Sequence, residues 1–223
     1  MKSKITVGCD EAGRGPVLGP LVMAALAVDE EGLKKLKWLG VKDSKLLSSS
    51  VREEMFERIR EIVTDFRVEM IEPDAIDLSL TEAESNLNWL EAETSARIIS
   101  ELNPDKIILD CPSVNIPAYE TYFKDRLTPR VRDNAELVVE HKADMNHLVV
   151  AAASVVAKVI RDRQIDRIKD EIGIDFGSGY MSDPKTKDFL EKYHQEHAIL
   201  FRRKWQSYKN ALAKKEQRSL GDF

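Results

Sequence analysis

The chain has 223 residues, of which 43% are hydrophobic and 33% are charged, and its formal net charge is −5. This length and apolar share are those of a globular protein with a sizeable core, and the acidic balance excludes a wholly basic nucleic-acid coat protein, although a local basic face remains compatible with it. Two cysteines cannot make a disulfide framework, and the sequence has neither a long apolar run nor a signal-type N-terminus, so we expect a soluble, cytoplasmic protein with no membrane contact.

The first part of the chain alternates between predicted strands and a predicted helix. Residues 4–9 and 20–28 are predicted strands, joined by a connection rich in glycine and proline. Ser50 and Glu53 have capping-box spacing, which predicts a helix that begins there. Residues 66–71 (F-R-V-E-M-I) alternate with a period of two, which predicts a half-exposed strand.

The rest of the chain continues this alternation and ends in helices. The predicted elements are a helix opened by Thr81 and Glu84, strands at 106–110 and 136–141, and helices at about 147–171, 184–197 and 202–215. Three early strands, then alternating helix and strand, then a helical end indicate an α/β domain with a mixed sheet.

Carboxylates follow the predicted strands. Asp10 and Glu11 come directly after the first strand, Asp110 ends another, and Asp144 follows the next one along the chain. If these strands are neighbours, their side chains converge at the carboxyl edge of the sheet, where open α/β sheets generally place ligands. The sequence therefore predicts a cluster of four acids at this edge.

Four carboxylates at one edge repel one another unless cations hold them. Hard oxygen ligands suit Mg²⁺ or Mn²⁺, and a pair of such ions about 3.5–4 Å apart is the usual apparatus for in-line phosphodiester displacement. Taken alone, Asp144 could be the N-cap of the long helix and Asp110 a turn residue. The pair of acids after the first strand has no packing benefit, so the set as a whole favours a metal site.

Six motifs occur in order along the chain. They are D-E-A-G-R-G-P-V-L-G-P, V-K-D-S-K-L-L, L-D-C-P, H-K-A-D, A-A-A-S-V-V-A-K-V-I-R-D-R and G-S-G-Y-M-S-D-P. Together they resemble type 2 ribonuclease H (ribonuclease HII), most of all its archaeal members, from the N-terminus to about residue 210. The resemblance implies a ribonuclease H-like fold, with a mixed five-stranded sheet flanked by helices and a C-terminal helical extension.

The resemblance also implies an activity. The family hydrolyses RNA within RNA–DNA hybrids and incises duplex DNA 5′ to a single ribonucleotide, leaving 3′-hydroxyl and 5′-phosphate ends, in ribonucleotide removal and RNA primer processing. The family's metal-binding acids map onto Asp10, Glu11, Asp110 and Asp144, which implies two Mg²⁺ or Mn²⁺ ions in each active site.

Residues that recognise the substrate map onto this chain as well. The family senses the 2′-hydroxyl with the backbone of its G-R-G turn and packs a tyrosine on the sugar that follows the ribonucleotide. Because only the 2′-hydroxyl distinguishes RNA from DNA locally, a turn whose glycines admit a sugar closely suits this task, although a plain turn with a surface arginine is the alternative. Met181 stands where the family pattern has proline. The residues implied in substrate binding are Gly13, Arg14, Gly15, Lys45, Ser154, Lys158 and Tyr180, and the basic run R-R-K-W (202–205) is a further candidate for phosphate contacts.

The C-terminal tail carries a short motif of its own. Gln217, Leu220 and Phe223 have the spacing Q-x-x-L-x-x-F, which resembles the box that docks proteins on the sliding clamp (PCNA), although that box usually has two aromatics and a frayed terminus is the alternative. The resemblance implies a monomer, and we expect a catalytic domain (1–200), a helical substrate-binding extension (201–216) and a clamp-binding tail (217–223).

Two other functional classes remain to be weighed. Actin-like ATPases and sugar kinases share a related core and strand-D-x-G turns, but they require further glycine-rich phosphate loops, which the later strands of this sequence lack. A clamp-tethered hybrid-binding protein with an inactive site is the non-enzymatic alternative, and the presence of all four acids counts against it.

Overall fold

The computed structural model describes residues 3–41, 48–81 and 85–221. The chain divides into two compact units. The first contains Met1–Ala12, Val22–Met70 and Asn88–Ile160, and the second contains Gly13–Leu21, Ile71–Leu87 and Arg161–Phe223. Within the described residues, none of the helices combines the length and the apolar character needed to cross a bilayer.

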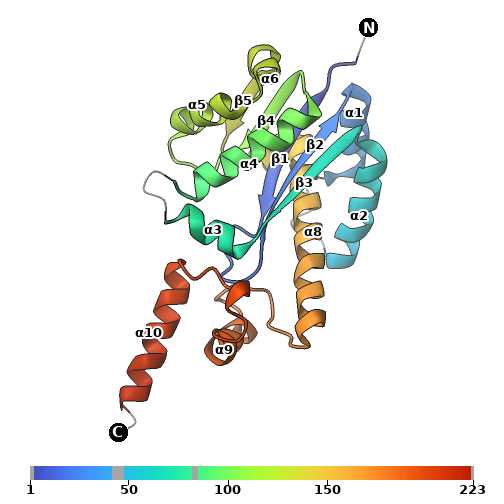
Figure 1. The fold of residues 1–223 in the computed structure, drawn as a ribbon. Coiled ribbons are helices and arrows are strands. Elements are labelled where there is room, and N and C mark those ends of the chain that lie inside the picture. Colours follow the sequence, from blue (N-terminus) through green and yellow to red (C-terminus); the bar gives the residue numbers. More distant parts are fainter. Residues whose placement is uncertain (1–2, 42–47, 82–84, 222–223) are drawn as a thin grey trace. The chain divides into compact units, whose positions relative to one another are not determined.

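The first unit is built on a five-stranded mixed sheet, which confirms the predicted fold class (Figure 1). Its strand order is β3-β2-β1-β4-β5. Strand β1 pairs antiparallel with β2 and parallel with β4, and β4 pairs parallel with β5. The bounds of the strands are β1 Thr6–Ala12, β2 Leu21–Val28, β3 Asp65–Ile71, β4 Lys106–Asp110 and β5 Glu136–Glu140.

Helices cover both faces of this sheet (Figure 1). On one face α1 (Glu30–Leu39), α2 (Ser49–Ile62) and the first part of α8 (Leu148–Ile172) bury a common apolar cluster with β2. On the other face lie α4 (Leu87–Leu102) and α5 (Ile116–Arg126). The short helices α6 (Pro129–Asn134) and α7 (Ala143–Asn146) precede and follow β5. A strand that is buried from both sides can keep apolar residues at every position, as β2 does.

The second unit gathers three separate stretches of chain. It contains α3 (Pro73–Ser79), the last part of α8, α9 (Pro184–Tyr193), the 3-10 turn η2 (Ala198–Leu200) and α10 (Gln206–Gly221). An apolar cluster holds it together, and its fully buried members include Leu18, Phe176 and Phe201. The connection from β1 to β2 belongs to this unit, where Leu18 forms a β-bridge with Phe201.

Two predicted boundaries in the first unit are wrong. Strand β1 continues to Ala12, beyond the predicted end at residue 9, because its register with β2 continues as far as the pair Ala12–Val22. Helix α2 is capped by Ser48 and not by Ser50, since the Ser48 hydroxyl accepts the N–H of Val51 at 3.4 Å. The first difference comes from a strand partner that local spacing does not reveal, whereas the second is a choice among three consecutive serines, Ser48 to Ser50.

The helix predicted to open at Thr81 begins instead at Leu87. The Thr81 hydroxyl donates to the carbonyl of Leu78 at 2.7 Å, so Thr81 belongs to the turn that ends α3. Glu84 lies outside the described residues. The last helix begins at Gln206 and not at residue 202, so R-R-K-W precedes it in a non-helical segment.

Candidate active site

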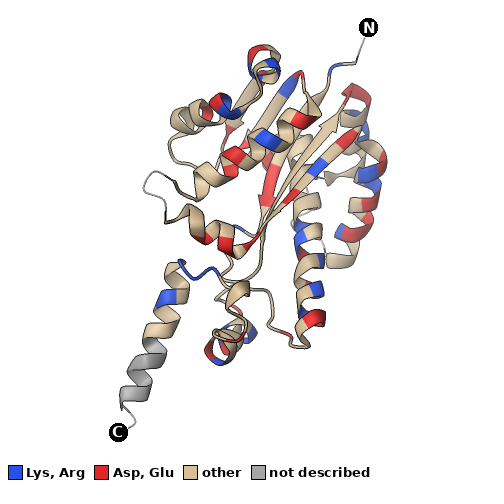
Figure 2. Cartoon of the chain, in the orientation of Figure 1, with Lys and Arg blue, Asp and Glu red and all other residues tan. Residues whose placement is uncertain are grey.

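Strand β1 carries the first two candidate acids near its end. The antiparallel register pairs Asp10 with Ala24 and Glu11 with Met23, whereas the parallel register with β4 extends only as far as Cys9. The two acids therefore lie where the pairing with β4 stops, at the carboxyl end of the parallel strands. Figure 2 shows them as the red segment of β1.

Asp10 is 7% exposed and is held by two hydrogen bonds. Its carboxylate accepts the N–H of Glu11 at 2.8 Å and the hydroxyl of Ser154 on α8. Burial raises the pKa of Asp10 well above its usual range, and the charges of Glu11 and Asp110 add to the rise, while the two hydrogen bonds oppose it. An ionised Asp10 is therefore stabilised by positive charge placed close to it.

Asp110 and Asp144 come from adjacent elements at the same end of the sheet. Asp110 ends β4, and its Oδ1 accepts the N–H of Ala143 at 2.7 Å, where α7 begins. Asp144 is the next residue of α7 and is 8% exposed. Helix α8 begins only at Leu148, so the reading of Asp144 as its N-cap is wrong. Because β1 and β4 are parallel neighbours, Asp10 and Asp110 converge as predicted.

The donor chemistry of these acids fits a hard divalent cation. Carboxylate oxygens are the ligands that Mg²⁺ and Mn²⁺ prefer, and a buried acid beside two others gains from such an ion. As the side chains stand, the described part of the chain contains no group of three or more His, Cys, Asp or Glu arranged to hold a metal ion. The acids thus fit by chemistry and by their place in the fold, and ion binding would have to draw their oxygens together.

Helix α8 supplies the other predicted residues of this unit. Ser154 hydrogen bonds to Asp10, so it supports an acid directly. Lys158 lies one helical turn further along and is half-buried. Lys45 lies outside the described residues.

The predicted G-R-G turn lies in the second unit. Gly13 has a φ of +86°, and a Cβ there would overlap the Arg161 side chain and lie 2.8 Å from the Pro20 carbonyl oxygen. A Cβ on Gly15, which is exposed, would lie 3.5 Å from the ring of Tyr180. A side chain at Gly13 would therefore overlap its neighbours, whereas one at Gly15 would only reach contact distance of the Tyr180 ring, so the turn and the predicted tyrosine are neighbours.

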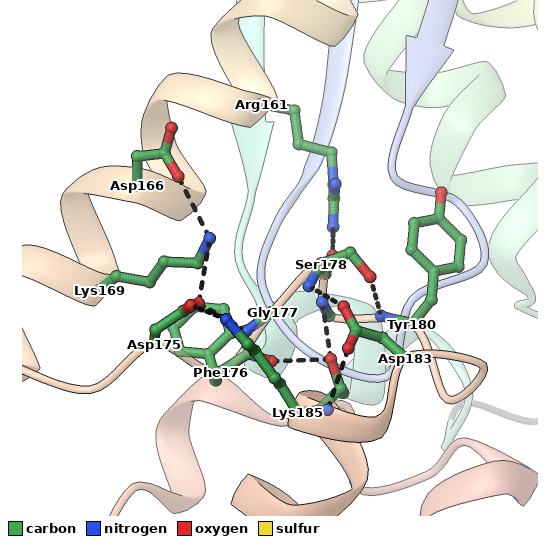
Figure 3. Close-up of polar contacts among 12 residues, drawn as sticks. Arg161, Asp166, Lys169, Asp175, Phe176, Gly177, Ser178, Tyr180, Asp183 and Lys185 are labelled. Atoms are coloured by element: carbon green, nitrogen blue, oxygen red, sulfur yellow. Dashed lines mark hydrogen bonds and ion pairs between the residues drawn. The ribbon is translucent and has the colours of Figure 1, made fainter. Parts of the chain in front are cut away.

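Tyr180 stands on a loop that hydrogen bonds hold in shape (Figure 3). Asp183 accepts the N–H of Ser178 at 2.8 Å and the N–H of Lys185 at 3.0 Å, which joins the loop to the start of α9. The Thr186 hydroxyl accepts the N–H of Gly179 at 3.0 Å. The loop thus presents Tyr180, 38% exposed, from a fixed backbone. Met181, where the family pattern has proline, packs against the apolar cluster of this unit.

Arg161 contacts both the Tyr180 loop and the position of a Cβ on Gly13. It is 2% exposed, donates to the Ser178 carbonyl at 3.4 Å and has its guanidinium carbon 5.6 Å from the centre of the Tyr180 ring (Figure 3). Burial lowers the pKa of Arg161, and within the described residues its Nε has no hydrogen-bond partner. Its burial and its contacts were not predicted from the sequence. A usable signal was its position four residues from the buried Ala157 and Ile165, on an apolar helix face.

Of the basic run R-R-K-W, the candidate for phosphate contacts, only Arg203 and Lys204 have exposed cationic side chains. Arg202 is fully buried, and its guanidinium donates to backbone carbonyls. Arg203 is paired with Asp74 at 2.9 Å. In the tail, Gln217 and Leu220 fall within α10, and Phe223 lies outside the described residues.

Comparison with known proteins agrees with this architecture. The family model described as Ribonuclease HII matches residues 7–208. Ribonuclease HII of Thermococcus sibiricus is 41% identical, over 97% of this chain and 96% of its own length. The crystal structure of ribonuclease H2 from Pyrococcus horikoshii has a TM-score of 0.81 at 37% identity and covers 94% of this chain and 98% of that one.

A second solved structure is that of the PCNA:RNase HII complex from Archaeoglobus fulgidus. It has a TM-score of 0.79 at 38% identity and covers 92% of this chain and 96% of the matched chain. These similarities extend over both units and include the mixed sheet that carries the acids. The chain therefore belongs to the ribonuclease HII family and is a ribonuclease H, a nuclease that acts on RNA–DNA hybrids.

Proposed function

We propose that this ribonuclease H also incises duplex DNA on the 5′ side of a single embedded ribonucleotide, leaving 3′-hydroxyl and 5′-phosphate ends. Such an activity serves ribonucleotide removal from DNA and the processing of RNA primers. The observation that carries the proposal is the buried Asp10 carboxylate, whose pKa is raised by burial and by the charges of Glu11 and Asp110.

Asp10, Glu11, Asp110 and Asp144 are the proposed ligands of two divalent ions, Mg²⁺ or Mn²⁺. Ribonucleases of this family depend on divalent metal. When bound, such ions activate the attacking water and stabilise charge on the phosphate and on the leaving 3′-oxygen. The chain itself orients the ligands, since Ser154 fixes one carboxylate of the set and the N–H of Ala143 fixes another.

We assign recognition of the ribose to residues of the second unit. The backbone of Gly13-Arg14-Gly15 would contact the 2′-hydroxyl, and Tyr180 would pack on the following sugar. The exposure of Gly15 and the 3.5 Å between its Cβ position and the Tyr180 ring support this assignment. Lys45 and Lys158 are proposed to contact phosphates, as cations that neutralise the nucleic-acid backbone do.

The test is a cleavage assay on a DNA duplex with one ribonucleotide, run with Mg²⁺ or EDTA and compared with an all-DNA duplex of the same sequence. We expect Mg²⁺-dependent cleavage at the ribonucleotide only, with ends that accept extension by a polymerase. Asp10→Asn should lower the rate by about a thousandfold or more. Equal cleavage by this variant would show that Asp10 is not a metal ligand.

A second function, docking on the sliding clamp, is favoured by a particular comparison. The matched Archaeoglobus fulgidus protein was solved in complex with PCNA. We propose that Gln217, Leu220 and Phe223 form a clamp-binding box, and that residues 201–216 help the catalytic domain of residues 1–200 to hold the substrate. Apolar anchors spaced three residues apart suit a short turn inserted into a groove.

A further inference from the structure

The Arg202 side chain joins both ends of the turn that follows β1. It is fully buried, and its Nη2 donates to the Gly13 carbonyl at 2.6 Å and to the Gly19 carbonyl at 2.9 Å. Its Nη1 donates to the Arg14 carbonyl at 3.0 Å, and its Nε donates to Gly19 at 3.1 Å. One guanidinium thus fixes three carbonyls with four hydrogen bonds.

These contacts set the direction of two peptide planes in the turn. In a trans peptide the C=O of one residue and the N–H of the next point in opposite directions, and the described chain contains no cis peptide. Because the Gly13 and Arg14 carbonyls point at Arg202, the N–H groups of Arg14 and Gly15 point away from the guanidinium. The hydrogen bonds from Arg202 therefore fix the orientation of these two N–H groups, next to the exposed Gly15.

Arg202 is itself held from both sides. Its own N–H donates to the Val17 carbonyl at 2.9 Å, within the same connection that its side chain binds. The next two residues donate their N–H groups to the buried Asp77, Arg203 at 2.7 Å and Lys204 at 2.9 Å. Such a donor acts as a rigid support, which is what a binding turn needs to keep its geometry.

We propose that Arg202 is the positioning residue of the ribose-reading turn. It holds the Gly13–Gly15 peptides in the orientation that meets the 2′-hydroxyl, without touching the substrate. This inference rests on the proposed function, in which that turn reads the ribose. Arginine suits the role because its planar fork offers several fixed donors, whereas lysine offers a single ammonium.

The experiment measures kcat, KM and the half-saturating Mg²⁺ concentration on a duplex with one ribonucleotide. The variants are Arg202→Met, which keeps the apolar stem, and Arg202→Lys. Phe189→Leu, buried in the apolar cluster of the same unit, is the control for lost stability, and Arg167→Met, on the exposed face of α8, is the control for a lost arginine. All are assayed at a temperature at which circular dichroism shows them folded.

We expect Arg202→Met to raise KM at least tenfold, Arg202→Lys to fall between it and the wild type, and the half-saturating Mg²⁺ concentration to stay within twofold. Both controls should remain within twofold in all three quantities. A KM for Arg202→Met within twofold of that for Phe189→Leu would overturn the inference. So would a failure of both Arg202 variants to fold, since the residue would then be needed for folding itself.

The proposed function can fail separately. If the wild type cuts RNA–DNA hybrids but not the duplex with one ribonucleotide, the proposed incision is wrong. The same variants are then compared on the hybrid, where an unchanged KM for Arg202→Met overturns the positioning role and a raised KM upholds it.

Discussion

The hydroxyl of Ser154 on α8 hydrogen bonds to the carboxylate of Asp10 on β1. On the opposite face of the same strand, Ser95 of α4 lies 3.6 Å from the sulfur of Cys9. A serine from a covering helix thus contacts β1 on each of its two faces. Only Ser154 contacts a candidate metal ligand, because the partner of Ser95 is Cys9. This gives a matched pair of substitutions.

Ser154→Ala should raise the half-saturating Mg²⁺ concentration for cleavage. A partner that orients a metal ligand typically contributes about tenfold to a hundredfold in metal affinity or activity. Ser95→Ala removes a hydroxyl that is more deeply buried and contacts Cys9 rather than an acid, so it should leave the Mg²⁺ dependence within twofold. Mg²⁺ titrations of hybrid cleavage measure both, and identical titration curves for the two variants would contradict the assigned role of Ser154.

Asp10→Asn should make the metal-free protein more stable while it removes activity. The substitution deletes a buried charge that faces other carboxylates, and each unit of pKa rise corresponds to about 1.4 kcal/mol of destabilisation of the ionised form. The folded-state pKa is raised, so the gain is largest above that value and shrinks as the pH falls toward 3.8.

Calorimetry in EDTA at pH 8 and pH 4 checks this expectation. A gain in stability raises Tm, so the Tm of Asp10→Asn should exceed that of the wild type at pH 8. Added Mg²⁺ should then raise the Tm of the wild type but not that of Asp10→Asn. A lower Tm for the variant in EDTA at pH 8 would mean that the carboxylate is not strained in the metal-free fold.

Local patterns predict the sheet and the position of Asp10 and Asp110 at its edge, because these depend on residues close in the sequence. Strand alternation and the position of each acid relative to a strand end place Asp10 and Asp110 at one edge. The contacts of Arg202 with the turn could not be predicted in this way, because its carbonyl partners Gly13 and Gly19 lie 189 and 183 residues away in the sequence. From the sequence alone, every residue of a basic run is expected to face solvent, and only the fold shows that Arg202 is buried.

Gly13→Ala should damage both stability and ribonucleotide recognition. The residue has a φ of +86°, and the new Cβ would overlap the Arg161 side chain, so strain and overpacking add up to about 2–5 kcal/mol. Gly40→Ala is the matched control. Gly40 has a φ of +75°, but nothing lies within 4 Å of the position of its Cβ, so only the backbone strain of about 1–2 kcal/mol remains.

Urea unfolding and cleavage of a duplex with one ribonucleotide separate these two effects. Gly40→Ala should cleave at the wild-type rate when both proteins are folded, whereas Gly13→Ala should lose at least tenfold in kcat/KM. Equal losses of stability in the two variants would argue against the close packing of Arg161 on the turn.

Deletion of residues 217–223 should abolish clamp binding and leave cleavage of short duplexes intact. The segment carries the proposed box Gln217, Leu220 and Phe223. All proposed substrate contacts lie before residue 217 in the chain. Calorimetric titration of PCNA with the full chain, the truncation and Phe223→Ala measures the effect, with at least a tenfold loss expected for the single substitution. Unchanged affinity in the truncation would exclude the tail as the docking element.

The pair formed by Asp175 and Lys185 should make the Tyr180 loop sensitive to acid (Figure 3). The Lys185 ammonium and the N–H of Gly177 lower the pKa of Asp175 to about 2. A lowered folded-state pKa contributes stability that is complete above the usual value of 3.8 and is lost as the pH falls through about 2. Asp175→Asn should therefore lower Tm at pH 6, and the difference from the wild type should disappear between pH 4 and pH 2. Asp170→Asn, at an exposed position of α8, controls for the loss of an aspartate. If the Tm difference between Asp175→Asn and the wild type stays constant down to pH 2, the ion pair does not hold the loop that presents Tyr180.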